Sequence, residues 1–192
     1  MNPRIILAST SPRRKELLSK GGFDFEVMSG DYEEDMTLPI PPHELVRHLS
    51  HGKAQSVSKK QNDAVIIGAD TVVVFNGEVY GKPKTKERAR EFLCKFNGEM
   101  HSVITGYTII NAITGELISN SIETKVYFKK VSNEVIETYL KNDEALDKAG
   151  AYGFQGLGGQ LFIKKTEGDT DNIIGLPVQN ILGDLKKMGV IT

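Results

Sequence analysis

A set of ionisable side chains has the types that catalysis on a phosphate ester needs. The set comprises two carboxylates, two lysines and a pair of adjacent arginines: Glu34, Asp70, Lys53, Lys82, Arg13 and Arg14. Carboxylate oxygens bind Mg²⁺ or Mn²⁺, a bound metal lowers the pKa of water, and cations neutralise the charge that grows on phosphoryl oxygens. The sequence lacks the Walker lysine motif and the protein-kinase motifs, which disfavours phosphoryl transfer from ATP. The set therefore favours metal-assisted hydrolysis.

The opening segment has the pattern of a strand, a tight loop and the start of a helix. An apolar run over residues 4–8 precedes Ser9-Thr10-Ser11-Pro12-Arg13-Arg14. Ser11 is a suitable N-cap and Pro12 suits the first helical position, so we expect a helix that ends near Gly21-Gly22. The N–H groups and positive dipole end of this helix, with the two arginines, favour a bound phosphate chain. A capped surface helix with solvated arginines is equally consistent with this segment.

Asp70 is the one charged residue in a long β-branched run over residues 64–75, which predicts a strand buried on both faces. A carboxylate in such a run is destabilising unless it is paired, hydrogen-bonded or bound to a metal. We therefore favour a functional role over the alternative, an aspartate at a strand break after Gly68. Asn76-Gly77 predicts a hairpin whose return brings Lys82 near Asp70.

The segment before this strand contributes a lysine and an acidic loop. Residues 42–60 have helical periodicity, and Lys53 falls on or beside the inward stripe, four residues after Leu49. It either extends from the core edge to solvent or points into a cleft. The loop over residues 29–42 contains an acidic cluster that includes Glu34. We favour a solvated face for this cluster over a metal-binding role.

The glycine-rich stretch over residues 147–159 lets backbone approach a ligand closely, and a flexible connector is the alternative. We expect long strands over 100–112 and 116–130, shorter strands over 23–28, 160–165 and 170–174, and helices over 85–96, 132–142 and 177–188. Cys94 should be a packing residue of the helix over 85–96. Hairpins among strands and helices predict an α/β fold with a mixed sheet packed by helices.

The composition limits the classes of partner. The chain has 192 residues, and 24 basic against 25 acidic residues give a formal net charge of -1. Such a balance provides no bulk field for nucleic acid or an anionic membrane. One cysteine, no signal-peptide pattern and no apolar run of membrane-spanning length lead us to expect a cytoplasmic protein that binds neither nucleic acid nor membrane.

Five motifs together resemble the Maf family of nucleotide pyrophosphatases. They are Ser9-Thr10-Ser11-Pro12-Arg13-Arg14, Gly68-Ala69-Asp70-Thr71, Gly81-Lys82-Pro83, the run from Asp147 to Gly156, and Gly175-Leu176-Pro177. The resemblance covers essentially the whole chain and implies a single Maf-like domain over residues 1–192. It also implies an elongated mixed sheet in two lobes with a central cleft, as in the inosine triphosphate pyrophosphatases. The implied reaction is hydrolysis of a nucleoside triphosphate to the monophosphate and pyrophosphate with Mg²⁺ or Mn²⁺, and the implied assembly is a homodimer.

The resemblance also assigns roles to residues. Asp70 matches the catalytic carboxylate and general base, and Glu34 matches the acidic loop residue that shares the metal, with Glu33 beside it as the alternative. The implied phosphate-handling and substrate-binding residues are Ser9, Ser11, Arg13, Arg14, Lys53, Lys82, Asp147 and Lys148. Arg13, Thr71 and Gln155 match positions that tune base specificity.

The stretch from Asp147 to Gln155 resembles the branch that acts on dTTP and UTP, and CTP or modified pyrimidine nucleotides stay open as substrates. The Gln155 amide suits the O4 and N3–H edge of thymine or uracil, because it offers a donor and an acceptor. Family members often have aromatic residues after Asp169, where this chain has Thr170-Asp171-Asn172. A nucleotide-binding regulator of septum formation without catalysis is the alternative function.

Overall fold

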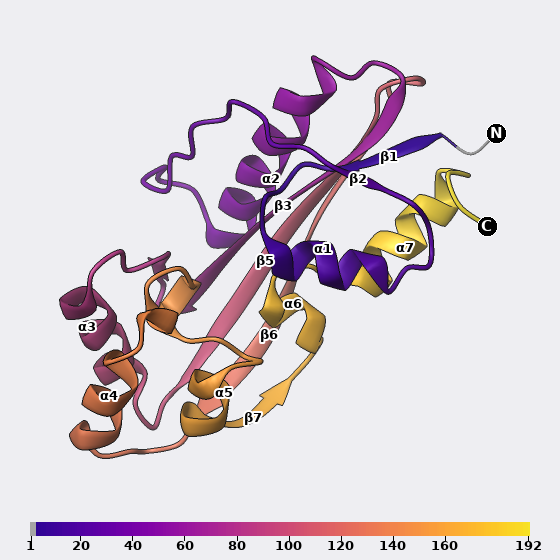
Figure 1. Ribbon diagram of the computed structural model, residues 1–192. Coiled ribbons are helices and arrows are strands. Elements are labelled where there is room, and N and C mark those ends of the chain that lie inside the picture. Colours follow the sequence, from indigo (N-terminus) through magenta and orange to yellow (C-terminus); the bar gives the residue numbers. More distant parts are fainter. Residues whose placement is uncertain (1–2) are drawn as a thin grey trace. The chain divides into compact units, whose positions relative to one another are not determined.

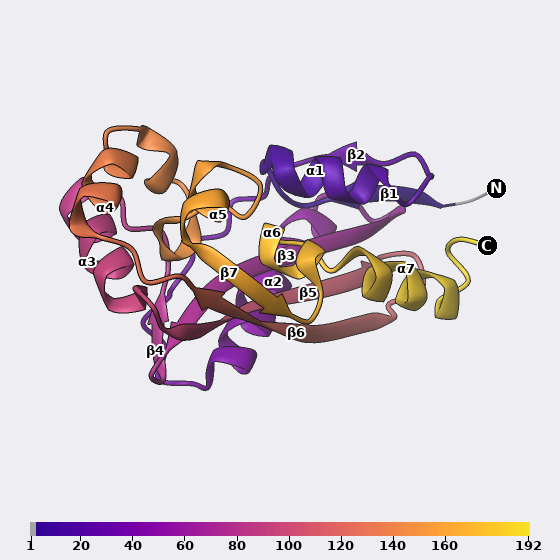
Figure 2. The same cartoon turned by 90° about the horizontal axis from the view of Figure 1, so that it is seen from below.

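The computed structural model describes residues 3–192, whose strands form a seven-stranded mixed sheet (Figures 1 and 2). The sheet order is β2-β1-β3-β5-β6-β7, and β4 pairs with β3. β1 is parallel to β2 and β3, whereas the β3–β4 and β6–β7 pairs are antiparallel. The strands are β1 (Arg4–Leu7), β2 (Glu26–Val27), β3 (Ala64–Phe75), β4 (Glu78–Tyr80), β5 (Met100–Asn111), β6 (Leu117–Phe128) and β7 (Ile163–Glu167). This architecture confirms the prediction of a mixed α/β fold.

Helices separate most of these strands along the chain. They are α1 (Pro12–Ser19), α2 (Pro42–Ser58), α3 (Lys86–Phe96), α4 (Asn133–Leu140), α5 (Leu157–Phe162), α6 (Thr170–Ile174) and α7 (Val178–Lys187), with short 3-10 helices η1 (Asp143–Ala145) and η2 (Ala149–Ala151). The predicted starts at Pro12 and after Thr85 are confirmed, since Ser11 and Thr85 accept hydrogen bonds from the backbone of the first helical turn.

Two compact units share the three long strands. The first unit comprises Met1–Asp70, Thr105–Ile122 and Gly175–Thr192, and the second comprises Thr71–Ile104 and Glu123–Ile174. β3, β5 and β6 each contribute residues to both units. The boundary within β3 falls directly after Asp70, in the middle of a continuous strand.

In the first unit, α2 and α7 contact opposite faces of β5. A Cβ atom at Gly106 would lie 2.3 Å from the backbone carbon and oxygen of Val46, so α2 lies directly on this strand. The next residue, Tyr107, points to the other face and donates a hydrogen bond of 2.6 Å to Asp184 of α7. α2 also lies on β3, because a Cβ atom at Gly68 would be 2.4 Å from the Ser50 carbonyl oxygen.

The core of the second unit is aromatic. Phe96, Phe128 and Tyr152 surround His101, whose ring is 1% exposed and stacks on Phe96. The His101 Nε2 atom lies 2.6 Å from the Tyr152 hydroxyl oxygen. Tyr152 belongs to the glycine-rich stretch, so this pair fastens that stretch to β5.

The sequence-based prediction is partly wrong between residues 160 and 174. Residues 157–162 form α5, so the strand expected over 160–165 begins at Ile163 and continues as β7 to Glu167, and α6 replaces the strand over 170–174. Asp169 caps α6 by accepting a hydrogen bond of 2.9 Å from the Asp171 N–H. Asn172 is buried and donates to the Val103 carbonyl and the Thr124 hydroxyl, so these polar contacts outweigh the strand pattern.

Two smaller predictions are corrected as well. The strand expected over residues 23–28 is limited to Glu26–Val27. Cys94 was expected to pack in the core, but it is exposed on α3. The apolar positions Ala89, Phe92, Leu93 and Phe96 form the buried side of that helix, and Cys94 lies on its outer side.

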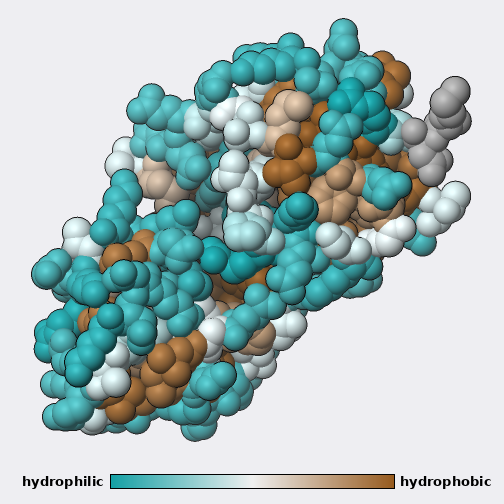
Figure 3. All heavy atoms as spheres, viewed as in Figure 1, coloured by the Kyte–Doolittle hydropathy of each residue, from teal (hydrophilic) through white to brown (hydrophobic). Residues whose placement is uncertain are grey.

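Hydrophilic residues cover most of the face seen in Figure 3, and apolar side chains form smaller patches among them. No helix within residues 3–192 combines the length and apolar character that a membrane span requires.

Gly68→Ala should destabilise the protein, because the new Cβ atom would overlap the backbone of α2 at Ser50 and Ala54. Overpacking of this kind costs about 1–3 kcal/mol of unfolding free energy, which urea denaturation would measure. Gly183→Ala is the matched control: no described atom lies within 4 Å of its added Cβ atom. It should stabilise α7 by up to about 1 kcal/mol. Equal effects of the two substitutions would contradict the packing described for α2.

His101→Phe should make stability less sensitive to acid. Burial lowers the pKa of His101 to about 3, whereas an unfolded histidine titrates near pH ~6.5. Between these values the unfolded chain binds one proton more, so wild-type stability falls by about 1.4 kcal/mol per pH unit as the pH decreases. Urea midpoints between pH ~6.5 and ~4 should fall less steeply in His101→Phe. Tyr152→Phe should keep the wild-type slope; a wild-type slope in His101→Phe would refute the assignment.

Candidate active site

Three of the predicted residues meet in the first unit. Lys53 Nζ lies 2.5 Å from Asp70 Oδ1 and 2.9 Å from Glu34 Oε1. The side chains of Asp70, Lys53 and Glu34 are 7%, 16% and 45% exposed, respectively, so the cluster extends from the interior to the surface. The second Asp70 oxygen, Oδ2, is buried and makes no hydrogen bond with any of residues 3–192. The cluster therefore contains a buried acceptor with unused capacity.

The packing of β3 on α2 brings Asp70 and Lys53 together. Gly68 lies on the α2 backbone at Ser50 and Ala54, and Asp70 follows two residues later on the same face of β3. Lys53 lies on the inward side of α2, as its position after Leu49 predicted. The alternative of a strand break is wrong, since β3 continues from Ala64 through Asp70 to Phe75.

The acidic loop is not entirely a solvated face, because Glu34 bonds Lys53. Asp31 and Glu33 are exposed, as that interpretation predicted. Asp31 pairs with Lys60 at the surface, at a distance of 2.5 Å. Glu34 is therefore the carboxylate of this loop that contacts Lys53, whereas the alternative residue, Glu33, is exposed.

The N-terminus of α1 organises Ser9, Ser11 and Arg14. The Ser11 hydroxyl accepts a hydrogen bond of 3.5 Å from the Arg14 N–H, and its own N–H donates to Ser9 Oγ at 3.2 Å. The Arg14 guanidinium donates to Ser9 Oγ at 3.4 Å and to the Gly175 carbonyl at 2.9 Å. Ser11 thus acts as the predicted N-cap, and Arg14 is held by protein groups rather than fully solvated.

The electrostatic surroundings link Arg14 to the carboxylates. Burial lowers the pKa of Arg14, whereas the negative charges of Asp70 and Glu34 raise it and the positive charge of Arg13 lowers it further. An arginine keeps its charge under such opposing influences. Arg14 therefore supplies a fixed positive charge beside the carboxylate cluster.

The carboxylate pair fits a hard divalent cation. Asp70 Oδ2 is a buried oxygen without a donor, and Glu34 provides a second carboxylate bonded to the same lysine. Carboxylate oxygens are the ligands that Mg²⁺ prefers, and Mg²⁺ usually keeps several waters and takes one or two protein carboxylates. Groups of three or more potential ligands among His, Cys, Asp and Glu are not found within the described residues. Within the described residues, Asp70 and Glu34 are therefore the two carboxylates that could hold such a cation.

The remaining residues that the sequence predicted for the site belong to the second unit. Lys82 is exposed just after β4, and the neighbouring Gly81 carbonyl accepts a hydrogen bond of 3.1 Å from the Gly150 N–H. This bond places the Lys82 segment beside the glycine-rich stretch. Gly150 has a φ of 70° and lies against Val73, a contact that a side chain at this position would obstruct.

Asp147 and Lys148 contact each other on this stretch. Lys148 Nζ lies 3.2 Å from Asp147 Oδ1 and donates to the Glu144 carbonyl at 3.0 Å. Gln155 is exposed, and Thr71 is half-buried on β3 directly after Asp70. Within residues 168–172, where the family resemblance is weakest, Asn172 is buried and bonded to Val103 and Thr124.

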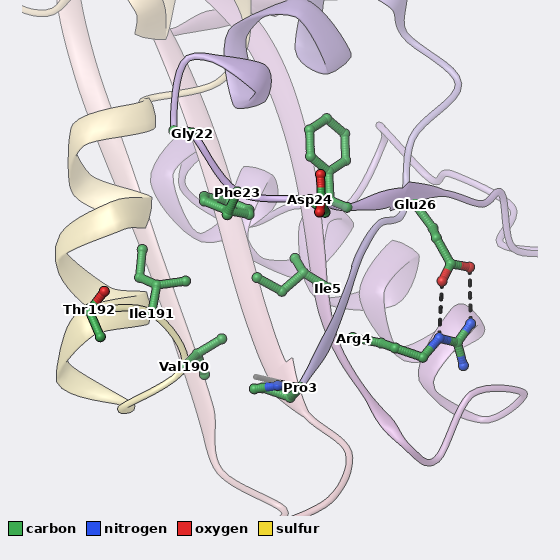
Figure 4. Close-up of a pocket in the computed structure, with 12 residues that line it drawn as sticks. Pro3, Arg4, Ile5, Gly22, Phe23, Asp24, Glu26, Val190, Ile191 and Thr192 are labelled. Atoms are coloured by element: carbon green, nitrogen blue, oxygen red, sulfur yellow. Dashed lines mark hydrogen bonds and ion pairs between the residues drawn. The ribbon is translucent and has the colours of Figure 1, made fainter. Parts of the chain in front are cut away.

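A pocket of about 600 Å³ in the first unit contains none of the predicted residues. It is lined by residues at the start of β1, by the segment between Gly21 and Glu26, and by Val190–Thr192 (Figure 4). Its cation, Arg4, bonds Glu26 and Asp63. This pocket therefore does not have a guanidinium available for phosphate, in contrast to the predicted site.

Sequence reasoning missed Tyr32, which lies close to the carboxylate cluster. Burial raises the pKa of its hydroxyl, and the charges of Glu34, Asp70 and Asp35 raise it further. Its ring lies on Gly52 of α2. An aromatic residue within an acidic loop was a signal for such packing, but the glycine that accommodates the ring is 20 positions away in the sequence.

The chain is similar to known proteins over almost its whole length. Relatives named dTTP/UTP pyrophosphatase include those of Geotalea uraniireducens (41% identical, covering 97% of this chain and 96% of the relative) and Thermoanaerobacter sp. (44%, covering 96% of each). A third, from Methanosarcina barkeri, is 45% identical and covers 97% of this chain and 95% of its own. The solved structure of the Staphylococcus aureus Ham1 protein is similar in fold, with a TM-score of 0.59, 14% identity, and coverage of 96% of this chain and 99% of that one.

The family model described as "Maf-like protein" matches residues 4–188. This match includes every residue of the carboxylate cluster, the α1 N-terminus and the glycine-rich stretch, and the chain therefore belongs to the Maf family.

Proposed function

We propose that this protein hydrolyses dTTP and UTP to the nucleoside monophosphate and pyrophosphate. The observation that carries the proposal is the buried Asp70 carboxylate, which bonds Lys53 through one oxygen and has no donor within residues 3–192 for the other. The names of the relatives support the substrate class. CTP and modified pyrimidine triphosphates belong to the same class to be tested.

Asp70 acts as the general base in this proposal. The Asp70 carboxylate accepts a proton from a water molecule, whose oxygen forms a bond to the α-phosphorus while the bond to the β-phosphate breaks and pyrophosphate leaves. Lys53 holds the carboxylate through Oδ1, and Oδ2 makes no hydrogen bond with any of residues 3–192. A positioned base of this kind accelerates a reaction by about 10²- to 10⁴-fold.

Glu34 and Asp70 are the residues that would hold Mg²⁺ or Mn²⁺. When bound, such a cation makes water more acidic and neutralises phosphate charge. Lys53 lies between the two carboxylates and limits their mutual repulsion.

The phosphate chain is bound by the α1 N-terminus and its cations. Arg14 and Ser9 are already bonded to each other, so binding does not have to order them. Ser11 shapes the loop as the N-cap, and the N–H groups of the first turn favour an anion. We propose Arg13, Lys53 and Lys82 as further cations that balance the charge on the phosphates.

The base is recognised by Gln155, with Thr71 and Arg13 as further contributors. A glutamine amide pairs with both the O4 acceptor and the N3–H donor of thymine or uracil. Asp147 and Lys148 are proposed as additional substrate contacts, and the bond from Lys148 to the Glu144 carbonyl fixes their orientation on the loop.

Asp70→Asn should lower turnover by about 100-fold or more, because the amide keeps the size of the side chain and cannot accept the proton. The measurement is product analysis with Mg²⁺ or Mn²⁺ and dTTP, UTP, CTP, ATP, GTP or 7-methyl-GTP. Wild-type protein should form monophosphate and pyrophosphate from dTTP and UTP, and a chelator should abolish both products. Asp63→Asn, at an exposed carboxylate paired with Arg4, is the matched control.

Unchanged turnover in Asp70→Asn would refute the assignment of the base. A folded wild-type protein that binds these nucleotides without hydrolysing any of them would favour the nucleotide-binding regulator instead.

Gln155→Ala should lower kcat/KM for dTTP and UTP by about tenfold, the loss expected when a base edge loses its hydrogen-bond partner. The same assay with each nucleotide measures it. Gln160→Ala, at another exposed glutamine of the second unit, is the control and should leave kcat/KM unchanged. Equal values for Gln155→Ala and wild type would remove Gln155 from base recognition.

A further inference from the structure

The acidic loop packs on α2 at two positions, and at each of them one of the contacting residues is a glycine. A Cβ atom at Gly52 of α2 would lie 2.2 Å from both Cε2 and Cζ of Tyr32, so the ring contacts the helix backbone directly. A Cβ atom at Gly30 would lie 1.8 Å from Ser56 Oγ, so the loop backbone in turn accommodates a helix side chain. Ser56 is itself held, because its hydroxyl donates to the Lys53 carbonyl at 2.8 Å.

These contacts are adjacent to residues of the carboxylate cluster both on α2 and in the acidic loop. Gly52 precedes Lys53 on α2, and Tyr32 precedes Glu34 by two residues in the loop. The Tyr32 ring lies on Gly52, and the next helix residue, Lys53, contacts both Glu34 and Asp70. Tyr32 is therefore in place to determine where Glu34 lies.

The loop has few other means of holding Glu34. Residues 29–41 form neither helix nor strand, and the Glu34 side chain is 45% exposed. The ion pair between Asp31 and Lys60 joins two exposed side chains, and such surface pairs contribute little. Contact of a rigid ring with a helix backbone restricts the loop far more than a solvated ion pair does.

We infer that Tyr32 is a positioning residue, which holds Glu34 at Lys53 and opposite Asp70 by packing its ring on Gly52. The inference rests on the proposed function, in which Glu34 and Asp70 bind a divalent cation. Glycine is required at position 52 because a larger residue would displace the ring, although glycine weakens a helix by about 1 kcal/mol relative to alanine. The loop carboxylate is then pre-organised for the cation.

Binding of Tb³⁺ alone provides a test that does not depend on turnover. Tb³⁺ is a hard cation that binds carboxylate oxygens, and its luminescence is sensitised by a tyrosine close to it. The chain contains no tryptophan, so tyrosine is the sensitiser. Wild-type protein should bind Tb³⁺, measured by calorimetry, and should show sensitised emission, and Asp70→Asn should lose both.

Three substitutions distinguish the contributions of the Tyr32 ring, the Tyr32 hydroxyl and Gly52 to cation binding. Tyr32→Ala and Gly52→Ala should each weaken Tb³⁺ binding by about tenfold, the lower end of the effect of residues that orient metal ligands. The double variant should be no weaker than Tyr32→Ala, because both changes remove the same contact. Tyr32→Phe restores the ring and should restore the affinity, yet it should lose most of the sensitised emission. Gly183→Ala controls for a glycine-to-alanine change in a helix and should bind as wild type does.

Wild-type affinity in folded Tyr32→Ala or Gly52→Ala would overturn the inference, with the fold checked by circular dichroism and urea denaturation. Additive losses in the double variant would also overturn it. In either case the proposed function stands if the wild-type protein hydrolyses dTTP. If wild-type protein neither binds Tb³⁺ nor forms pyrophosphate, the proposed function fails as well.

Discussion

A buried carboxylate in an otherwise apolar strand is the constraint on which the rest of the structure depends. Removing a charge from water costs several kcal/mol unless a partner accompanies it. Lys53 is that partner, and it reaches Asp70 because Gly68 lets α2 lie directly on β3. The close packing of this helix on this strand, the inward placement of a lysine and the attachment of the acidic loop can all be understood as consequences of that charge.

Much of the fold was predictable because its local signals agree with its packing. The Ser11 and Thr85 caps, the Asn76-Gly77 hairpin and the apolar run of β3 each specify a structure that tertiary contacts also favour. Asp70 stood out by the same logic, since a charge within an apolar strand conflicts with local physics and usually marks a function. Helical periodicity predicted that Lys53 lies on or beside the inward side of α2, but it left open whether the ammonium reaches solvent or a cleft.

The unpredicted parts depend on contacts between residues distant in the sequence. Residues 170–174 were expected to form a strand, but Asn172 is buried within α6 and bonds Val103 and Thr124. Tyr32 and Gly52 were missed for the same reason, because neither is unusual without the other. Residue types alone favoured a solvated face for the acidic cluster that includes Glu34, and the family resemblance singled out Glu34, whose contact with Lys53 depends on how the loop packs on α2.

The three strands shared by both units have a consequence for modularity. Because β3, β5 and β6 each pass from one unit into the other, neither unit corresponds to a contiguous stretch of the gene. Neither can be expressed as a single fragment, exchanged between homologues by one crossover, or lost without cutting a strand in the middle of its hydrogen-bonded ladder. Asp70 is the last residue of the first unit and Thr71 is the first of the second. Recombination at this boundary would separate Asp70, the proposed proton acceptor, from Thr71, which is proposed to help recognise the nucleobase.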